Sequence, residues 1–178
     1  MPRRAAALSR RVDLIGEGFD IAIRVRNKLD TDATLVVRTV GQSRVLLVAS
    51  PAFLDAQGRP RTPEDLAALP LLSMNDHDGA QVLDLVGPSG AKLQVEMQAR
   101  LVSGDFAVLL EAAKRGMGIA TLPDVACAAA IASGELEVVL PDWAMPQGTV
   151  HFVYPTRRGL LPGVRALVDF LAERLAVA

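Results

Sequence analysis

Three consecutive residues, Ser103, Gly104 and Asp105, have the types and the position to contact a small anion. They lie where an alternating strand pattern gives way to apolar residues at helical spacing, so they open a predicted helix. The first N–H groups of a helix have no partner within it, and the helix dipole is positive there, which favours anions. The same residue types also occur simply as helix caps, and this segment taken alone favours capping.

Arg24 is a second candidate for anion binding. It closes a short apolar run, Asp20–Val25, whose composition is typical of a buried strand. A guanidinium at the carboxyl end of a strand can bind a carboxylate through two parallel hydrogen bonds. Most arginines are only surface residues, so both interpretations stay open.

Metal-binding and catalytic patterns are weaker. Residues 75–78 (Asn-Asp-His-Asp) have the types of metal ligands, but no second cluster at ligand spacing accompanies them, so we interpret them as a solvated turn. The Gly-Met-Gly run at 116–118 follows a predicted helix, whereas a dinucleotide-binding fingerprint opens one. His77 and His151 lack evident catalytic partners. We therefore predict no metal, no cofactor and no enzymatic activity.

A strand, helix and strand in Val95–Pro123 must position the first candidate residues. Alternating apolar and polar residues up to Val102 predict a strand with one wet face, and a helix begins near Phe106. Gly116 follows basic residues in the last helical turn, which predicts a left-handed helix end. The apolar run 117–122 then predicts a strand that is buried on both faces.

Similar patterns cover the rest of the chain. The other predicted strands are 35–40, 45–49, 82–86, 92–102, 136–140 and 150–154, with a hairpin turn at 87–90. Helices are predicted in 51–57, after Thr62-Pro63, in 125–132 and from Pro162, where Arg165 and Asp169 are spaced for an ion pair. His151 and Cys127 are interpreted as structural residues.

Composition narrows the class of protein. The 178 residues are 51% hydrophobic, which is enough for a real core in one domain or two small lobes. A net charge of −1 lacks the basic excess that phosphate binding requires. One cysteine, no apolar run of membrane-spanning length and no secretory signal predict a cytoplasmic protein that is not membrane-bound.

Three segments in order resemble one protein family. The segment SGDFAVLLEAAKRGMGIATLP at 103–123 is similar to the effector-domain signature of LysR-type transcriptional regulators. VDLIGEGFDIAIRV at 12–25 and VLLVASPAFLDAQGRPRTPEDLAALPLL at 45–72 agree with the same family in order and spacing. The likeness runs from about Arg11 to the C-terminus.

The resemblance implies a fold and a function. The fold is α/β, periplasmic-binding-protein-like of type II, with mixed sheets and an incomplete first lobe at 1–41 plus 156–178; the second lobe is 42–155. The function is effector sensing, in which a small anionic metabolite binds between the lobes and biases attached DNA-binding domains. The implied ligand-binding residues are Ser103, Gly104, Asp105, Thr121 and Arg24.

The same resemblance sets the expected partners. DNA is bound only through a helix-turn-helix domain that we expect this chain to lack, together with the first strand and helix of the first lobe. Homo-oligomers are possible and no membrane partner is expected. The alternatives are a free-standing solute-binding protein, which should carry an export signal, and a small α/β transferase or hydrolase, which needs a nucleophile and a base.

Overall fold

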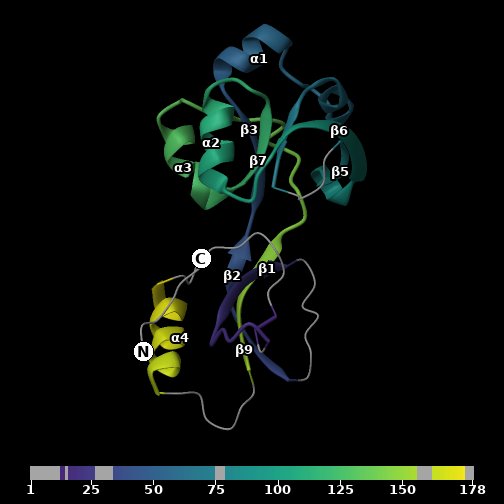
Figure 1. Cartoon of the computed structure of the whole chain (residues 1–178). Coiled ribbons are helices and arrows are strands. Elements are labelled where there is room, and N and C mark those ends of the chain that lie inside the picture. The colour runs from purple at the N-terminus through teal and green to yellow at the C-terminus, as the bar shows by residue number, and fades with distance from the viewer. Residues whose placement is uncertain (1–12, 15, 27–33, 75–78, 156–161, 175–178) are drawn as a thin grey trace. The chain divides into compact units, whose positions relative to one another are not determined.

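The computed structural model describes residues 13–14, 16–26, 34–74, 79–155 and 162–174. The chain divides into two compact units, with Met1–Ser43 and Gln147–Ala178 in unit 1 and Arg44–Pro146 in unit 2. Each unit contains its own β-sheet (Figure 1). No described helix has the length and apolar character needed to cross a membrane.

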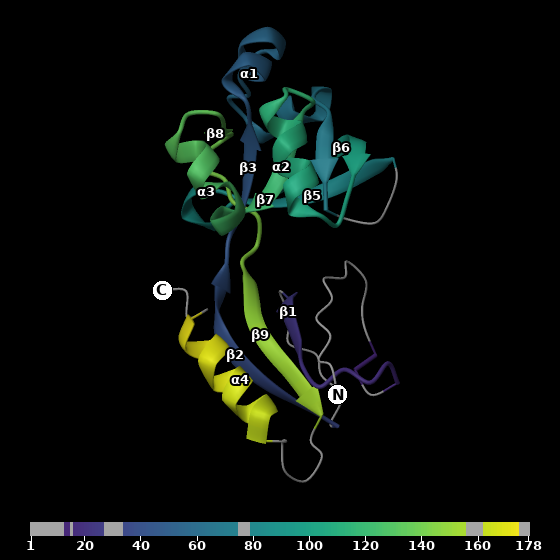
Figure 2. The same ribbon diagram turned by 60° about the vertical axis from the view of Figure 1, so that its left-hand side comes forward.

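Unit 1 is an antiparallel sheet covered by one helix. Val164 and Val168 recur one helical turn apart and are buried together with Phe152 of the central strand, which fixes the helix on the sheet. Figure 2 shows this helix alongside the strands that it covers. The strands lie in the order β1 (Ala22–Arg26), β9 (Gly148–Pro155) and β2 (Leu35–Ser43), and the helix is α4 (Pro162–Arg174).

An ion pair joins α4 to β2. Arg38 lies opposite Phe152 in the sheet register, so its side chain is on the face that α4 covers. Its Nη1 lies 2.5 Å from Oδ1 of Asp169. The sequence predicted Arg165 as the partner of Asp169, but here Asp169 faces the sheet and reaches Arg38. Both side chains are about half exposed, so the pair contributes at most about 1 kcal/mol to the free energy of unfolding.

Two boundaries in unit 1 differ from the predictions. The strand β9 was expected in the second lobe, yet it pairs along its length with β1 and β2 and so belongs to unit 1. The strand β2 was expected to stop at Val40. It continues to Ser43 through a bulge between Thr39 and Gly41, because its last residues still pair with the start of β9.

Unit 2 is a mixed sheet, as predicted for the fold. The short strand β4 is parallel to both neighbours, β6 and β7, and the remaining pairs are antiparallel. The predicted hairpin at 87–90 is confirmed. In sheet order the strands are β5 (Ala80–Val86), β6 (Lys92–Val102), β4 (Leu71–Ser73), β7 (Ile119–Pro123), β3 (Val45–Ala49) and β8 (Glu137–Val138).

Apolar layers cover both faces of this sheet. On one face, α2 (Phe106–Lys114) and α3 (Asp124–Ala132) pack against Val48 and Leu122, and Figure 1 shows the two helices side by side. On the other face, α1 (Pro51–Gln57) and the 3-10 helix η1 (Pro63–Ala68) pack with apolar residues of the β5–β6 hairpin. The strand β7 is buried throughout, as the short apolar run at 117–122 predicted.

Helix ends follow the predicted signals. The Ser50 hydroxyl accepts a hydrogen bond from the N–H of Phe53 at 3.3 Å and so caps α1.

The prediction that residues 136–140 form a strand holds only for Glu137 and Val138, the residues that pair with β3. The run at 75–78 lies outside the described residues.

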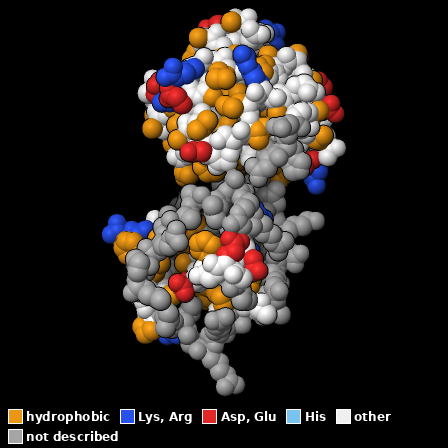
Figure 3. Space-filling view, viewed as in Figure 1, with side chains coloured by type: hydrophobic (Ala, Val, Ile, Leu, Met, Phe, Trp, Pro, Cys, Tyr) orange, Lys and Arg blue, Asp and Glu red, His pale blue; other side chains and the backbone are white. Residues whose placement is uncertain are grey.

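The visible surface in Figure 3 has acidic and basic side chains interspersed with apolar ones over unit 2. This mixture agrees with the net charge of −1 for the whole sequence. No large basic field is visible on that face of unit 2, which is the face turned to the viewer.

Candidate functional site

The carboxyl ends of three parallel strands meet at one edge of the unit 2 sheet. Ser73 is the last residue of β4 and lies beside Val102, the last residue of β6. Leu72 lies beside Ala120 in the register of β4 and β7, so the next residues along, Ser73 and Thr121, are neighbours on adjacent strands. This edge is where open α/β sheets bind ligands.

Ser103 and Asp105 build the start of α2 at this edge. The N–H of Ser103 donates to the carbonyl oxygen of Ser73 at 3.0 Å, which fixes the segment to the end of β4. The N–H of Asp105 donates to the Ser103 hydroxyl oxygen at 3.1 Å. Of the three N–H groups that the sequence offered to an anion, two therefore already donate within the chain. Within the described part of the chain, the Gly104 N–H and the Ser103 hydroxyl proton remain as donors without an acceptor.

Asp105 is the N-cap of α2. Its Oδ1 accepts from the N–H of Ala107 at 2.8 Å, and its carbonyl oxygen accepts from the N–H of Leu109 at 3.3 Å. The carboxylate therefore takes the position at the positive helix end that an anionic ligand would otherwise occupy. A ligand oxygen at this edge would instead meet Ser103 and Gly104, which are half-buried and exposed respectively.

Thr121 is the fourth predicted residue at this edge. It is 3% exposed and lies opposite Leu47 in the register of β3 and β7. Its side chain is on the sheet face that is away from α2, because Ile119, two residues earlier, packs with the other core layer. The structure thus brings Ser103, Gly104, Asp105 and Thr121 to one edge of unit 2.

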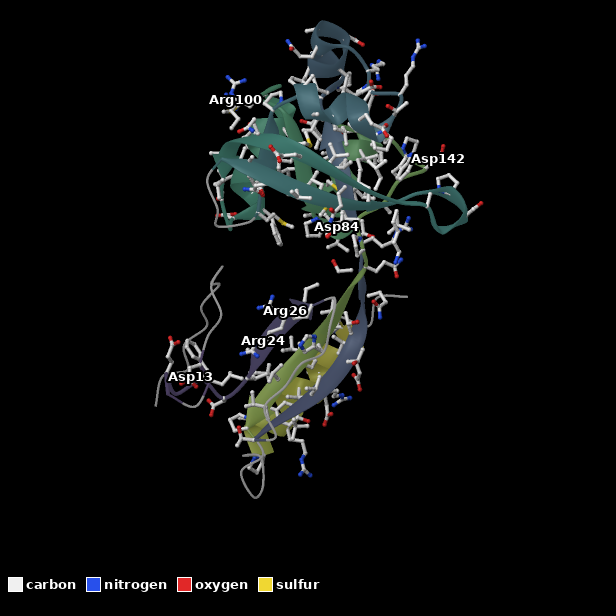
Figure 4. All side chains as sticks on the ribbon, turned by 90° about the vertical axis from the view of Figure 1, so that its right-hand side faces the viewer. Asp13, Arg24, Arg26, Asp84, Arg100 and Asp142 are labelled. Atoms are coloured by element: carbon white, nitrogen blue, oxygen red, sulfur yellow. The ribbon has the colours of Figure 1, made fainter. Side chains whose placement is uncertain are left out.

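Arg24 lies elsewhere, in unit 1. The strand β1 extends through Arg26, so Arg24 is in the middle of the strand and does not close it, contrary to the prediction. The pairing of β1 with β9 lengthens the strand, with Arg26 opposite Thr149. Arg24 is half-buried, and Figure 4 shows its side chain with that of Arg26 on β1.

Sequence reasoning missed two buried polar residues, Ser73 and Gln81. They are 1% and 6% exposed, and the Ser73 hydroxyl donates a short hydrogen bond to the Gln81 side-chain oxygen. A serine that ends the apolar run Leu71–Ser73 is a signal that could have identified the first of them. The pairing of Gln81 with it depends on the fold, because β6 lies between β4 and β5.

Two other polar or reactive residues are structural, as predicted. His151 is 2% exposed and its Nδ1 lies 2.9 Å from the carbonyl oxygen of Thr149. Cys127 is buried in α3, with Sγ 3.4 Å from the carbonyl oxygen of Pro123, and burial raises the pKa of its thiol. Among the described residues, no three His, Cys, Asp or Glu side chains are grouped to hold a metal ion.

Comparison with known proteins identifies relatives of the whole chain. Residues 5–176 match the family described as the LysR substrate binding domain. An uncharacterized HTH-type transcriptional regulator of Haemophilus influenzae is 34% identical over 158 residues, covering 85% of this chain and 51% of the relative. The HTH-type transcriptional regulator DmlR of Escherichia coli is 32% identical over 171 residues, covering 94% of this chain and 53% of the relative. The chain spans about half the length of these curated relatives.

Solved structures of transcriptional regulators are also similar to this chain. The regulatory domain of the C227S variant of AphB from Vibrio vulnificus has a TM-score of 0.75 at 27% identity, with 88% of this chain and 78% of that chain covered. CrgA, a LysR-type transcriptional regulator from Neisseria meningitidis, has a TM-score of 0.77 at 25% identity, with 93% and 55% covered.

Proposed function

The chain belongs to the LysR substrate-binding domain family, and from this premise we propose that it senses a small-molecule effector for a transcriptional regulator. Its mixed α/β architecture is the periplasmic-binding-protein-like fold, type II, of LysR regulatory domains, as the sequence predicted. The observation that carries the proposal is the meeting of three parallel strand ends with the start of α2 at one edge of unit 2.

The proposed effector is a small carboxylate. Its oxygen would accept hydrogen bonds from the Ser103 hydroxyl and the Gly104 N–H, two donors just before the helix that have no acceptor within the described residues. Thr121 adds a hydroxyl at the same edge. Arg24, on β1 of unit 1, stays a prediction from the sequence as a ligand-binding residue.

Regulation follows if effector binding favours one conformation of the protein over another. A ligand shifts such an equilibrium only by the difference between its affinities for the two states. In the proposed regulator, that shift would bias DNA-binding helix-turn-helix domains and the contacts of a homo-oligomer. The regulator would act in the cytoplasm. The proposal assigns binding to this chain and no catalytic step.

Substitution of Ser103 tests the proposal. Thermal denaturation of the chain is measured with acetate, succinate, benzoate or sulfate at constant ionic strength. The carboxylate that raises Tm most is then titrated into the chain by calorimetry. Ser103→Ala should raise the Kd of that carboxylate by about ten-fold or more, because a hydrogen bond to a charged group contributes about 1.5–3 kcal/mol.

Ser133→Ala is the matched control. The Ser133 hydroxyl also makes a local hydrogen bond at a helix end, to the Ala130 carbonyl oxygen at 3.2 Å, but at the far end of α3. It should lower stability slightly and leave the Kd unchanged. Equal Kd values for wild-type and Ser103→Ala chains would contradict the assignment of Ser103, and no Tm shift with any of the anions would contradict a carboxylate effector.

A further inference from the structure

Exposed apolar side chains gather at the carboxyl edge of the unit 2 sheet. Within the described residues, unit 2 exposes four large apolar side chains, and three of them are in the first turns of α2 and α3. These three are Phe106, Val108 and Val125, and the fourth, Val82, is on the hairpin strand β5. Because β6 and β7 both run parallel to β4, the helices that follow them begin at the same edge. The edge that carries the candidate site therefore also carries exposed apolar surface.

Phe106 belongs to an apolar stripe of α2 that extends beyond the core. Leu110 and Ala113 follow it at helical spacing, and both pack in the apolar layer that α2 and α3 form with the sheet. Ala113 is fully buried, Leu110 is half-buried and Phe106 is 43% exposed. Burial therefore decreases along this side of α2 toward the helix start, and the stripe ends with an exposed phenyl group at the carboxyl edge.

Val108 lies on a different side of the same helical turn. It is two residues after Phe106, so its side chain leaves α2 roughly half a turn away. Lys114, about two turns after Phe106, forms an ion pair with Glu135, which follows α3, at 3.1 Å. The Phe106 side of α2 thus faces α3. Val108 is 47% exposed, so the two apolar side chains have similar exposure and different neighbours.

The start of α2 places the Phe106 side chain near the Ser103 and Gly104 donors. Side chains on an α-helix tilt toward the helix start, so a residue in the first turn covers the segment just before it. Phe106 is the first residue of α2, and only the N-cap Asp105 separates it from Gly104. Two residues of chain span at most about 7 Å, so a ligand of the length of one ring can reach both the Gly104 N–H and the Phe106 ring.

The polar groups at this edge give little selectivity by themselves. The Ser103 hydroxyl and the Gly104 N–H are uncharged donors, and the adjacent Asp105 carboxylate, which caps α2, is itself an anion. Small-molecule sites combine a few placed polar groups with a larger apolar surface. An exposed phenyl group supplies such a surface, and it favours another aromatic ring because aromatic pairs gain from offset or edge-to-face packing.

We propose that Phe106 forms an apolar wall of the effector site and that the effector is an aromatic carboxylate. The carboxylate group would accept hydrogen bonds from the Ser103 hydroxyl and the Gly104 N–H, and the ring would pack on Phe106. Phe106 would then determine specificity, because it contacts the ring and not the carboxylate. This inference rests on the proposed function and names the chemical class of its effector.

Three carboxylates of the same charge test the effector class. Acetate, cyclohexanecarboxylate and benzoate are titrated into the whole chain by calorimetry at pH 7 and constant ionic strength. Benzoate should bind about ten-fold or more tightly than acetate, because its ring buries additional apolar area. It should bind about three-fold or more tightly than cyclohexanecarboxylate, whose ring has the same number of carbons and no π-system.

Substitutions at Phe106 test its role. Phe106→Ala should raise the Kd of benzoate about five-fold or more and leave the Kd of acetate nearly unchanged. Phe106→Leu keeps most of the apolar volume and should remove the preference for benzoate over cyclohexanecarboxylate, whereas Phe106→Tyr keeps the ring and should keep it. Val108→Ala is the matched control in the same helical turn and should alter none of the Kd values. Urea denaturation checks that each variant is folded under the titration conditions.

The outcomes distinguish this inference from the proposed function. Equal affinity of the wild-type chain for benzoate and acetate, or for benzoate and cyclohexanecarboxylate, overturns the aromatic class and leaves carboxylate sensing in place. A benzoate preference that persists in both Phe106→Ala and Phe106→Leu overturns the assignment of Phe106, as does an equal loss of acetate and benzoate affinity in Phe106→Ala. Absence of binding by all three carboxylates overturns the inference together with the carboxylate effector.

Discussion

At the scale of single residues, Gly116 ends helix α2 in a left-handed conformation, with φ of +72°. The Gly116 N–H donates to the Ala113 carbonyl oxygen at 3.0 Å, and the Met117 N–H donates to that of Ala112 at 3.1 Å. This is the Schellman arrangement, in which the last carbonyl groups of the helix are satisfied by the residues just beyond it. The positive φ confirms the prediction made from the sequence.

Alanine at Gly116 should lower the free energy of unfolding by about 1–2 kcal/mol, measured by urea denaturation. A Cβ there meets its nearest atom, the Ser50 Oγ, at 3.5 Å, an ordinary contact, so the backbone conformation alone causes the loss. Gly134→Ala is the matched control, because Gly134 has φ of +75° and open space around it. The two losses should agree, and a loss at Gly116 several times larger would mean that packing dominates there.

Alanine at Gly118 should cost more than alanine at Gly116, for a different reason. A Cβ on Gly118 would lie 2.5 Å from the Pro70 carbonyl oxygen, and that oxygen already accepts from the Ile119 N–H at 2.9 Å. A backbone group held in this way cannot move aside cheaply, so we expect a loss of about 2–3 kcal/mol. The same urea series measures it, and a loss below that of Gly116→Ala would contradict the tight approach of β7 to Pro70.

At the scale of elements, patterns that depend only on neighbours in sequence gave correct helices and hairpins. Capping of α1 by Ser50, the β5–β6 hairpin and the end of α2 all follow from local residue types. The predictions that were wrong concern features that depend on contacts with residues distant in the sequence. The length of β2 and the assignment of β9 depend on their pairing, and Asp169 reached Arg38 from a neighbouring element instead of Arg165 on its own helix.

In the candidate site too, some features could be predicted from local sequence and others could not. The strand-to-helix transition at Ser103 and the buried strand around Thr121 could be predicted because each lies within one local pattern. The hydrogen bond from Ser73 to Gln81 could not, since it joins strands that are not adjacent in the sheet. Local residue types also did not predict that the Ser103 hydroxyl oxygen accepts a hydrogen bond from the Asp105 N–H.

The start of η1 carries a pH-dependent contact. The Asp65 Oδ2 accepts from the N–H of Thr62 at 2.9 Å and from the N–H of Arg61 at 2.8 Å. These bonds, the one from Thr62 most, hold the pKa of Asp65 below its usual value. A carboxyl group of this kind stabilises the fold above its unfolded pKa of about 4, and that stability is lost as the pH falls through the lower folded pKa.

Asp65→Asn should therefore lower Tm at pH 7, with a difference from wild type that shrinks as the pH falls below about 4. Thermal denaturation between pH 7 and pH 3 measures the difference. Asp142→Asn, in an exposed turn, controls for the loss of one carboxylate. A Tm difference for Asp65→Asn that stays constant across this range would show that its hydrogen bonds to the backbone do not depend on its charge.

At the scale of the whole molecule, the charge of this chain argues against DNA binding by the chain itself. Its net charge is −1, whereas phosphate neutralisation requires an excess of Lys and Arg on one face. In a gel-shift titration at physiological salt, we expect this chain to retard no DNA fragment in a sequence-specific manner. Retardation of one fragment that survives excess competitor DNA would contradict this expectation.

The carboxyl edge of the unit 2 sheet is the proposed effector-binding site. The most direct measurement is an NMR titration of the isotopically labelled chain with the carboxylate that gives the largest Tm shift, with sodium chloride as the ionic-strength control. We predict saturable amide shift changes at Ser73, Ser103–Ala107 and Thr121, and none at the hairpin turn formed by residues 87–90. Saturable changes that leave the first three groups unaffected, or no saturable change at all, would contradict the claim.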